Sequence, residues 1–157
     1  MGGKTQDLRR TGLLVTGSLE IACTFLVDRS GALLLQLRDD KASYYPNVWG
    51  LPGGAVEDGE TPGEAAVREL WEETRLRPDG PLQLFARQEL PAQGAHRSRV
   101  KNYFYGTTSA GQDDVVLGEG AAMLFIPAAE VLDRPFTPGS AEIIERFLAS
   151  SEYAAFR

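Results

Sequence analysis

The sequence is short of cysteine, of long apolar runs and of positive charge, and each shortage excludes a class of protein. Its single cysteine, Cys23, has no partner for an internal disulfide and lies in an apolar run typical of a buried side chain. No apolar stretch approaches the roughly 20 residues needed to cross a bilayer. Sixteen Lys and Arg against 22 Asp and Glu give a net charge of −6. That balance argues against long nucleic acid or an anionic membrane as a partner.

The remaining composition is that of an ordinary globular chain. Apolar residues make up 43% and charged residues 24% of 157 residues, which is enough for one domain. The basic start of the chain is not followed by an apolar segment of secretory length. We therefore expect a cytoplasmic protein, monomeric or homodimeric, with a loose N-terminal segment over residues 1–17 and a single domain over residues 18–157.

Strand and helix patterns are mixed along the chain. Apolar and β-branched runs predict strands over residues 19–27, 32–37, 48–51, 82–90, 99–108 and 121–126. Helical patterns cover residues 61–76, 127–132 and 138–150. Several strands precede the first helix, which excludes a simple alternation of strand and helix. The expected class is α/β, with a mixed sheet between helices on both faces.

The helix predicted over residues 61–76 has a marked start and one apolar side. Thr61 is a suitable N-cap, Pro62 fits the first turn, and Glu64 completes a capping box. The side predicted to face the core consists of Ala66, Val67, Leu70, Trp71 and Thr74.

Three glutamates of this helix share another face. Glu69, Glu72 and Glu73 stand at i, i+3 and i+4, and only Arg68 opposes their charge nearby. A bound cation would relieve the repulsion between them. Carboxylate ligands without His or Cys favour Mg²⁺, with Mn²⁺ as the alternative, over zinc. Taken alone, such a triplet more often marks a solvated acidic surface than a metal site.

The residues around the glutamates resemble a known family motif. Gly54, Glu60 and the run Arg68-Glu69-Leu70-Trp71-Glu72-Glu73 match the Nudix box in identity and spacing, and Trp49 to Gly54 matches its usual lead-in. The resemblance spans residues 54–76 and implies an α/β/α sandwich. Arg75 departs from the pattern, which has Gly there, and this leaves open the shape of the loop that follows the helix.

The resemblance also implies roles for individual residues. Glu69, Glu72 and Glu73 match metal ligands, Gly53 matches a position whose carbonyl often joins them, and Arg68 matches an orienting arginine. Glu60 corresponds to a structural acid, and Glu119 lies where many members carry a further acidic ligand. The implied reaction is hydrolysis of a nucleoside diphosphate linked to another group X. Glu69 is the first choice for general base and Glu72 the second, with Glu119 as a third candidate.

Basic residues that follow the strand predicted over residues 82–90 offer a place for phosphates. His96 is followed by Arg97, Arg99 and Lys101, and guanidinium groups pair bidentately with phosphate. We predict that Arg97, Arg99 and Lys101, together with Arg38, bind the substrate. The competing interpretation of this segment is a solvated hairpin end.

Several substrates and roles remain open. The expected substrate is a small nucleotide, such as a nucleoside triphosphate or a nucleotide sugar. An ADP-ribose pyrophosphatase is the alternative, because a proline near the separation of Pro91 from the box recurs in that subfamily. A non-catalytic nucleotide-sensing domain is a second alternative, although the chain keeps the box carboxylates. An isoprenoid diphosphate isomerase would need a reactive cysteine, for which Cys23 is poorly placed.

Overall fold

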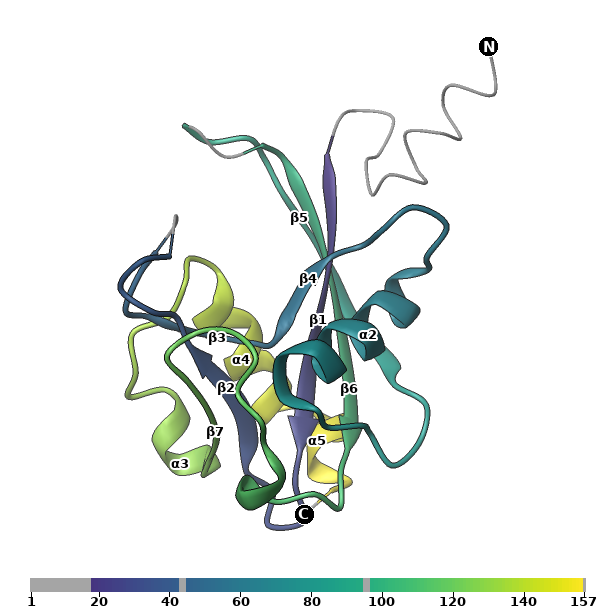
Figure 1. The fold of residues 1–157 in the computed structure, drawn as a ribbon, viewed down its shortest axis with the longest axis vertical. Coiled ribbons are helices and arrows are strands. Elements are labelled where there is room, and N and C mark those ends of the chain that lie inside the picture. The colour runs from purple at the N-terminus through teal and green to yellow at the C-terminus, as the bar shows by residue number, and fades with distance from the viewer. Residues whose placement is uncertain (1–17, 43–44, 95–96, 157) are drawn as a thin grey trace.

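The structure is a computed structural model that describes residues 18–42, 45–94 and 97–156 (Figure 1). The predicted N-terminal segment 1–17 and His96 lie outside the described residues. Among the helices described, none is long and apolar enough to span a membrane.

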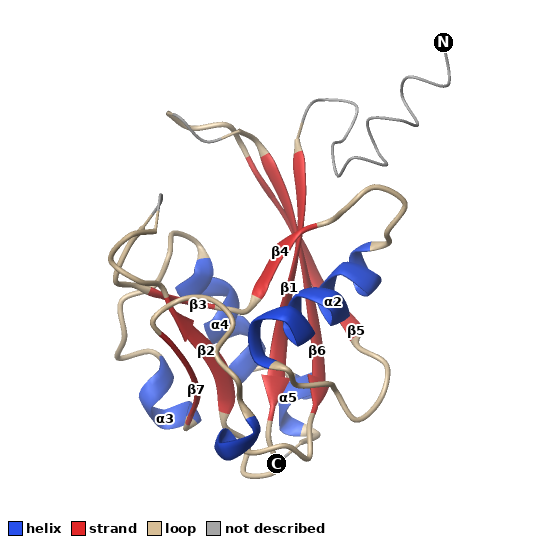
Figure 2. Ribbon diagram, viewed as in Figure 1, coloured by secondary structure: helices blue, strands red, loops and turns tan. Residues whose placement is uncertain are grey.

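A mixed sheet of seven strands forms the centre of the fold (Figure 2). The strands are β1 Leu19–Val27, β2 Leu33–Leu37, β3 Trp49–Gly50, β4 Gly53–Ala55, β5 Gln83–Leu90, β6 Arg99–Thr107 and β7 Ala122–Ile126. The order along the sheet is β3-β2-β1-β6-β5, with β4 paired to β1 and β7 paired to β2. Each strand predicted from the sequence is present to within one or two residues.

Strand β1 changes partner along one of its edges, and this change opens the sheet. Near its end, Val27 pairs with Leu33 of β2 in the predicted hairpin. Near its start, the same edge pairs with β4, with Cys23 opposite Gly53. The other edge pairs in parallel with β6 along its whole length. The sheet is therefore continuous at one end and forked at the other, with β4 inside the fork.

The helices are α2 Pro62–Thr74, α3 Ala128–Val131, α4 Ser140–Leu148 and α5 Ser151–Ala154, with a 3₁₀ turn η1 at Gln112–Asp114. The predicted capping box of α2 is present, because Thr61 and Glu64 bond to each other's backbone N–H groups. At the other end of α2, Arg75 itself takes the left-handed conformation, with φ 60° and ψ 22°. The helix therefore ends in the left-handed conformation that Gly usually adopts at this position. This conformation is strained for Arg75, because Arg has a Cβ atom.

Alternation along β1 and β6 assigns each face of the sheet to different helices. On one face, Ala22 and Phe104 pack against Ala65 and Ala66 of α2. On the other face, Phe25 stacks on Phe147 of α4, with ring centroids 4.2 Å apart. Helices thus cover both faces of the sheet, which confirms the predicted α/β/α class.

Part of the predicted apolar side of α2 is not core. Leu70 and Thr74 are buried as expected, but Val67 and Trp71 are only half-buried. The Trp71 ring instead lies beneath the guanidinium of Arg77, 4.3 Å from its centroid. Trp71 therefore lies at the edge of the interface between α2 and the sheet, where a cation–π contact with Arg77 replaces apolar packing.

Candidate functional site

The three glutamates of α2 differ widely in exposure although they share one side of the helix. Glu72 is exposed, the Glu69 side chain is 16% exposed, and Glu73 is buried with 2% exposure. We call these residues, with Glu60, the acidic face. Their gradient of burial means that one helix surface presents carboxylates in three different electrostatic environments.

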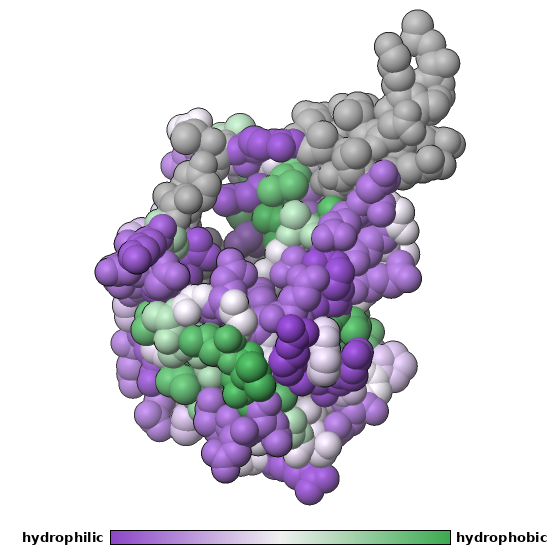
Figure 3. All heavy atoms as spheres, viewed as in Figure 1, coloured by the Kyte–Doolittle hydropathy of each residue, from purple (hydrophilic) through white to green (hydrophobic). Residues whose placement is uncertain are grey.

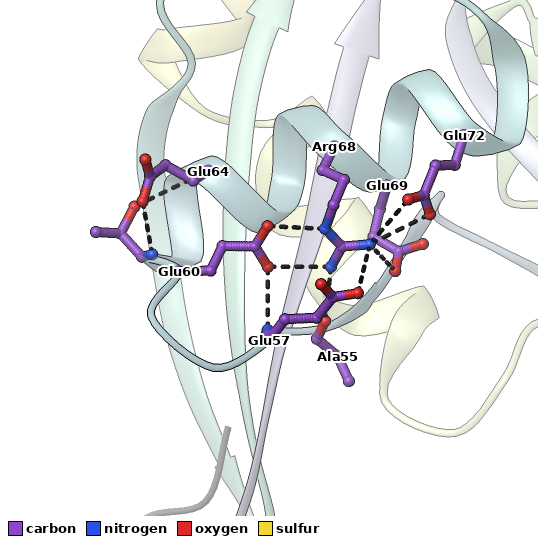
Figure 4. A network of polar contacts seen from close by, with 8 residues as sticks. Ala55, Glu57, Glu60, Glu64, Arg68, Glu69 and Glu72 are labelled. Atoms are coloured by element: carbon purple, nitrogen blue, oxygen red, sulfur yellow. Dashed lines mark hydrogen bonds and ion pairs between the residues drawn. The ribbon is translucent and has the colours of Figure 1, made fainter. Parts of the chain in front are cut away.

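Arg68 joins most of the acidic face into one network (Figure 4). Its Nε and Nη2 atoms bond both oxygens of Glu60 at 2.7 and 3.0 Å. Its Nη1 atom reaches Glu69 at 3.0 Å and Glu72 at 3.2 Å. The hydrogen bond from Arg68 holds the pKa of Glu60 below its usual value. The predicted orienting role is geometrically possible for Glu69 and Glu72.

Glu73 is held differently. It contacts Gly53 of β4, whose backbone N–H lies 3.1 and 3.3 Å from its two carboxylate oxygens. Burial raises the pKa of Glu73 to about 8, opposed by the Gly53 bond and increased by the charges of Glu69, Glu119 and Glu72. Arg68 contacts Glu69 and Glu72 but not Glu73 among the described residues.

Glu69 lies against the neighbouring glycine of β4. A Cβ atom on Gly54 would come within 2.5 Å of the Glu69 carboxylate carbon, so a larger residue there would displace the end of the Glu69 side chain. Burial raises the pKa of Glu69, and the bond from Arg68 only partly offsets the rise. Gly53 and Gly54 of β4 thus lie directly against the acidic face, on the side of β4 that faces α2.

The loop before β7 brings Glu119 to the same place. Two of its backbone N–H groups bond the last carbonyls of α2, Val116 to Thr74 at 3.0 Å and Gly118 to Glu73 at 2.9 Å. A Cβ atom on Gly118 would meet the Glu72 carbonyl oxygen at 2.3 Å, so the loop approaches the helix closely. Glu119 is exposed, yet its charge helps to raise the pKa of Glu69 and of Glu73.

The same loop also carries exposed apolar residues. Hydrophobic side chains gather over this loop and β7 in Figure 3, while hydrophilic residues cover α2. The exposed members are Val116, Leu117 and Leu124. The outer edge of β7 is occupied by Gln112, whose side-chain amide bonds Met123 and Phe125.

The acidic face suits a hard divalent cation, although its side chains are not gathered around one position. No group of three His, Cys, Asp or Glu side chains in the described part of the chain forms a ready cation site, and Arg68 binds Glu69 and Glu72 instead. The donors are all oxygen atoms, as Mg²⁺ prefers. Burial is the main cause of the raised pKa values of Glu69 and Glu73, so ionising these carboxyl groups costs free energy that a bound cation would offset.

A cleft of about 380 Å³ opens on the other side of β4, within the fork of the sheet. Its floor is one face of β1 and β6, and Gly53 and Gly54 form part of its wall. All four predicted substrate-binding cations line it: Arg38, Arg97, Arg99 and Lys101. We call this the basic cleft. The glycine backbone of β4 contacts the acidic face and borders the basic cleft, so the two lie next to each other.

Several further residues line the cleft that no sequence motif marks as functional. Gln36 lines it and donates from Nε2 to the Glu119 carbonyl at 3.1 Å. The signal available in the sequence was a single glutamine within a run of leucines, and the structure shows that it is buried. Thr137 and Ser140, whose hydroxyl groups bond each other, come from the start of α4. No local pattern marks them, because a distant helix brings them to the cleft.

Cys23 lies on the cleft floor as a buried thiol, 8% exposed. Burial raises its pKa to about 11, although the charge of Lys101 acts in the opposite direction. A thiol with so high a pKa is a poor nucleophile at neutral pH. The structure therefore agrees with a packing role for Cys23 and not with the cysteine chemistry of an isomerase.

Comparison with known proteins gives matches along most of the chain. Residues 19–147 match the family described as NUDIX domain. A candidate 8-oxo-dGTP diphosphatase of Mycobacterium tuberculosis is 34% identical over 123 residues, which is 76% of this chain and 55% of that protein. A dihydroneopterin triphosphate diphosphatase of Haemophilus influenzae is 45% identical over 49 residues, covering 31% of this chain and 28% of that protein. The chain thus matches only part of the length of each relative.

Solved structures share the fold at lower identity. A MutT protein from Methanosarcina mazei superposes with a TM-score of 0.69, covering 82% of this chain and 91% of that one. The two sequences are 23% identical over this region. This likeness confirms the architecture expected from the box.

Proposed function

The chain belongs to the Nudix hydrolase family, and on this premise we propose that it is a Mg²⁺-dependent pyrophosphohydrolase acting on a small nucleotide. The substrate is a nucleoside diphosphate linked to a further group, such as a nucleoside triphosphate or a nucleotide sugar. One observation carries the proposal: Gly53 and Gly54 contact the acidic face on one side and border the basic cleft on the other. A diphosphate lying across β4 would meet both at once.

Glu69, Glu72 and Glu73 are the proposed ligands of the divalent cation, with the Gly53 carbonyl and Glu119 completing the set. When bound, the cation supplies charge neutralisation and lowers the pKa of a coordinated water. The support from the structure is the oxygen-only donor set and the raised pKa values of Glu69 and Glu73, which a nearby cation would lower.

The protein side chains take the remaining roles in the proposed reaction: proton transfer, orientation of the carboxylates and binding of phosphate. Glu69 accepts the proton of the attacking water, because a half-buried carboxylate with a raised pKa is a better base near neutral pH. Glu72 is the second candidate for this role. Arg68 keeps both carboxylates oriented through its Nη1 atom. The water oxygen bonds to phosphorus, the anhydride P–O bond breaks, and the departing phosphate is held by the cations of the cleft.

The names of the two relatives support this class of reaction, since both are diphosphatases named for triphosphate compounds. The ADP-ribose and sensing alternatives make different predictions in one experiment. A sensing domain would bind nucleotides tightly without releasing products. An ADP-ribose pyrophosphatase would favour that compound over triphosphates.

The test is hydrolysis of a mixed nucleotide library with Mg²⁺ in H₂¹⁸O, with products identified by mass spectrometry. We expect Glu73→Gln and Glu72→Gln each to lower kcat by about a thousandfold or more, because a lost ligand removes electrostatic stabilisation of the transition state. Glu145→Gln on α4 is the matched control, since Glu145 is an exposed helix acid distant from the acidic face. Wild-type turnover in both variants would overturn the assigned roles.

A further inference from the structure

Glu119 reaches the acidic face through its backbone and not through contacts of its own carboxylate. Its side chain is exposed and makes no hydrogen bond or ion pair within the described part of the chain. Its charge nevertheless helps to raise the pKa of Glu69 and of Glu73, so the carboxylate lies near both. The position of this carboxylate therefore depends on how the peptide groups around residue 119 are held.

Glycines on both sides of Glu119 contribute no side chain that could fix this segment. Ordering a segment that contains Gly118 and Gly120 costs more conformational entropy than ordering other residues. One backbone bond joins the segment to α2, from the Gly118 N–H at 2.9 Å. Another joins it to β2, from the Ala121 N–H at 2.8 Å. The peptide of Glu119 lies between these two points.

Gln36 of β2 supplies a third hydrogen bond, and it is made to this peptide. Its Nε2 atom donates to the Glu119 carbonyl at 3.1 Å, and no other described side chain bonds the backbone of residues 118–120. Gly120 permits the close approach, because a Cβ atom there would lie 3.1 Å from the same Nε2 atom. Gln36 lines the basic cleft and also a smaller hollow that Glu119 borders. It therefore lies between the cleft and Glu119.

Packing alone does not explain a glutamine at this position. Gln36 is only 8% exposed and lies in a strand whose other members are leucines. Burying an amide costs free energy that its hydrogen bonds must offset, so a leucine would pack here at least as well. Within the described residues, the bond to Glu119 is the only hydrogen bond of the Gln36 side chain. The use that the structure shows for this amide is to fix the peptide that carries Glu119.

We propose that Gln36 is a positioning residue that holds Glu119 at the acidic face, so that the Glu119 carboxylate can join the metal ligands. The inference rests on the proposed function, in which Glu119 is one of those ligands. Residues that orient a metal ligand without touching the metal commonly contribute about ten- to a hundredfold to metal affinity. Because Gln36 acts through the Glu119 peptide, its contribution should disappear once Glu119 no longer binds the metal.

A double-mutant cycle with metal binding as the readout tests this role. Gln36→Met keeps an unbranched side chain of similar size but removes the donor. We expect it to weaken Mn²⁺ binding, measured by EPR without substrate, by about tenfold, and Glu119→Gln to weaken it at least as much. Added to Glu119→Gln, the Gln36→Met change should have less than about a twofold effect. Equal effects of Gln36→Met in both backgrounds would show that it does not act through Glu119 and would overturn the inference.

A second glutamine on a strand provides the matched control. Gln83 on β5 is exposed, and its amide oxygen accepts a hydrogen bond from the Tyr105 hydroxyl at 3.0 Å. Gln83→Met should leave Mn²⁺ affinity unchanged. Thermal unfolding with EDTA shows whether each variant is folded, and Gln36→Leu, which extends the leucine run of β2, serves if Gln36→Met is not. Wild-type Mn²⁺ affinity in the Gln36 variants, or failure of both to fold, would overturn the inference.

Turnover distinguishes failure of this inference from failure of the proposed function. Where a nucleotide is hydrolysed, Gln36→Met should raise the Mg²⁺ concentration that gives half-maximal rate by about tenfold. If Glu119→Gln binds Mn²⁺ as tightly as the wild type, the role of Gln36 is overturned, while the proposed function still stands on Glu72 and Glu73. If the wild type hydrolyses no nucleotide but the cycle behaves as expected, the proposed function fails and the role of Gln36 in metal binding stands.

Discussion

The acidic face and the basic cleft are neighbours of opposite charge that are organised in opposite ways. The acidic face contains its own counter-ion, because Arg68 bonds Glu60, Glu69 and Glu72 (Figure 4). The basic cleft has no carboxylate among its described lining residues, and the Nε atom of Arg99 has no partner there. The first region is held together by its own ion pairs, whereas the charged residues that line the second, among those described, are all cations.

The difference between them follows from where their residues lie in the chain. The acidic face comes from one helix and the loop before it, so its geometry is local. The basic cleft draws on the end of β2, on β6 and on the start of α4, which the fork in the sheet brings together. A local network can be stabilised by its own ion pairs, while a cleft assembled from distant segments depends on the whole fold.

The largest expected effect on stability comes from removing the arginine that joins the acidic face. Arg68→Gln removes the bidentate contact with Glu60 and leaves several carboxylates without a counter-charge. Because the Arg68 side chain is only 22% exposed, we expect the free energy of unfolding to fall by about 2 kcal/mol and Tm by about 4–8 °C. Mg²⁺ should raise Tm more in this variant than in the wild type. Thermal unfolding with EDTA and with Mg²⁺ measures both effects.

The matched control is Arg87→Gln, which removes an exposed arginine from a weaker pair. It should change Tm by less than about 2 °C. An Arg68→Gln variant as stable as the wild type would show that the network does not stabilise the acidic face.

A second prediction concerns pH. The folded pKa of Glu73, about 8, lies above its ordinary value of 4.5. Between these values the folded protein binds more protons than the unfolded chain, so stability without metal should fall as pH rises from 5 to 8. The slope is at most about 1.4 kcal/mol per pH unit for this group. Stabilisation by Mg²⁺ should grow over the same range, because the ligands must be ionised.

Urea unfolding at pH 5, 6, 7 and 8, with and without Mg²⁺, tests this prediction. Glu73→Gln should flatten the slope measured with EDTA, since Gln resembles the neutral acid, whereas Glu145→Gln should leave it unchanged. A metal-free protein that becomes steadily more stable toward pH 8 would contradict the assignment.

The smallest expected effect tests whether the acidic face depends on how its helix ends. Arg75→Gly relieves the left-handed conformation but removes a guanidinium 5.3 Å from the Trp71 ring centroid. We expect a net gain of about 0.5–1 kcal/mol, a rise in Tm of about 2 °C and no change in kcat. Arg77→Gly, at a position without positive φ, should instead lower Tm. Equal changes in the two variants would exclude backbone strain as the cause.

The sequence predicted the elements of the fold well and the details of their packing less well. Strand and helix bounds followed from periodicity and capping residues, as Thr61 and Glu64 illustrate. The short strand β4 was missed, because three residues rich in glycine show no alternation of apolar and polar side chains. Trp71 was misplaced in the core, since helical spacing does not reveal that a neighbouring arginine covers the ring.

What the sequence determined by itself is the acidic face: residues three and four apart on one helix must share a side, so their identities and spacing predict a cluster of carboxylates. Only the tertiary structure decided that Glu73 is buried against Gly53 while Glu72 stays exposed, because burial depends on what packs against the helix. It also decided that Arg38 meets Arg99 and Lys101 across one cleft. Contacts between distant segments depend on strand order and register, which a local pattern does not specify.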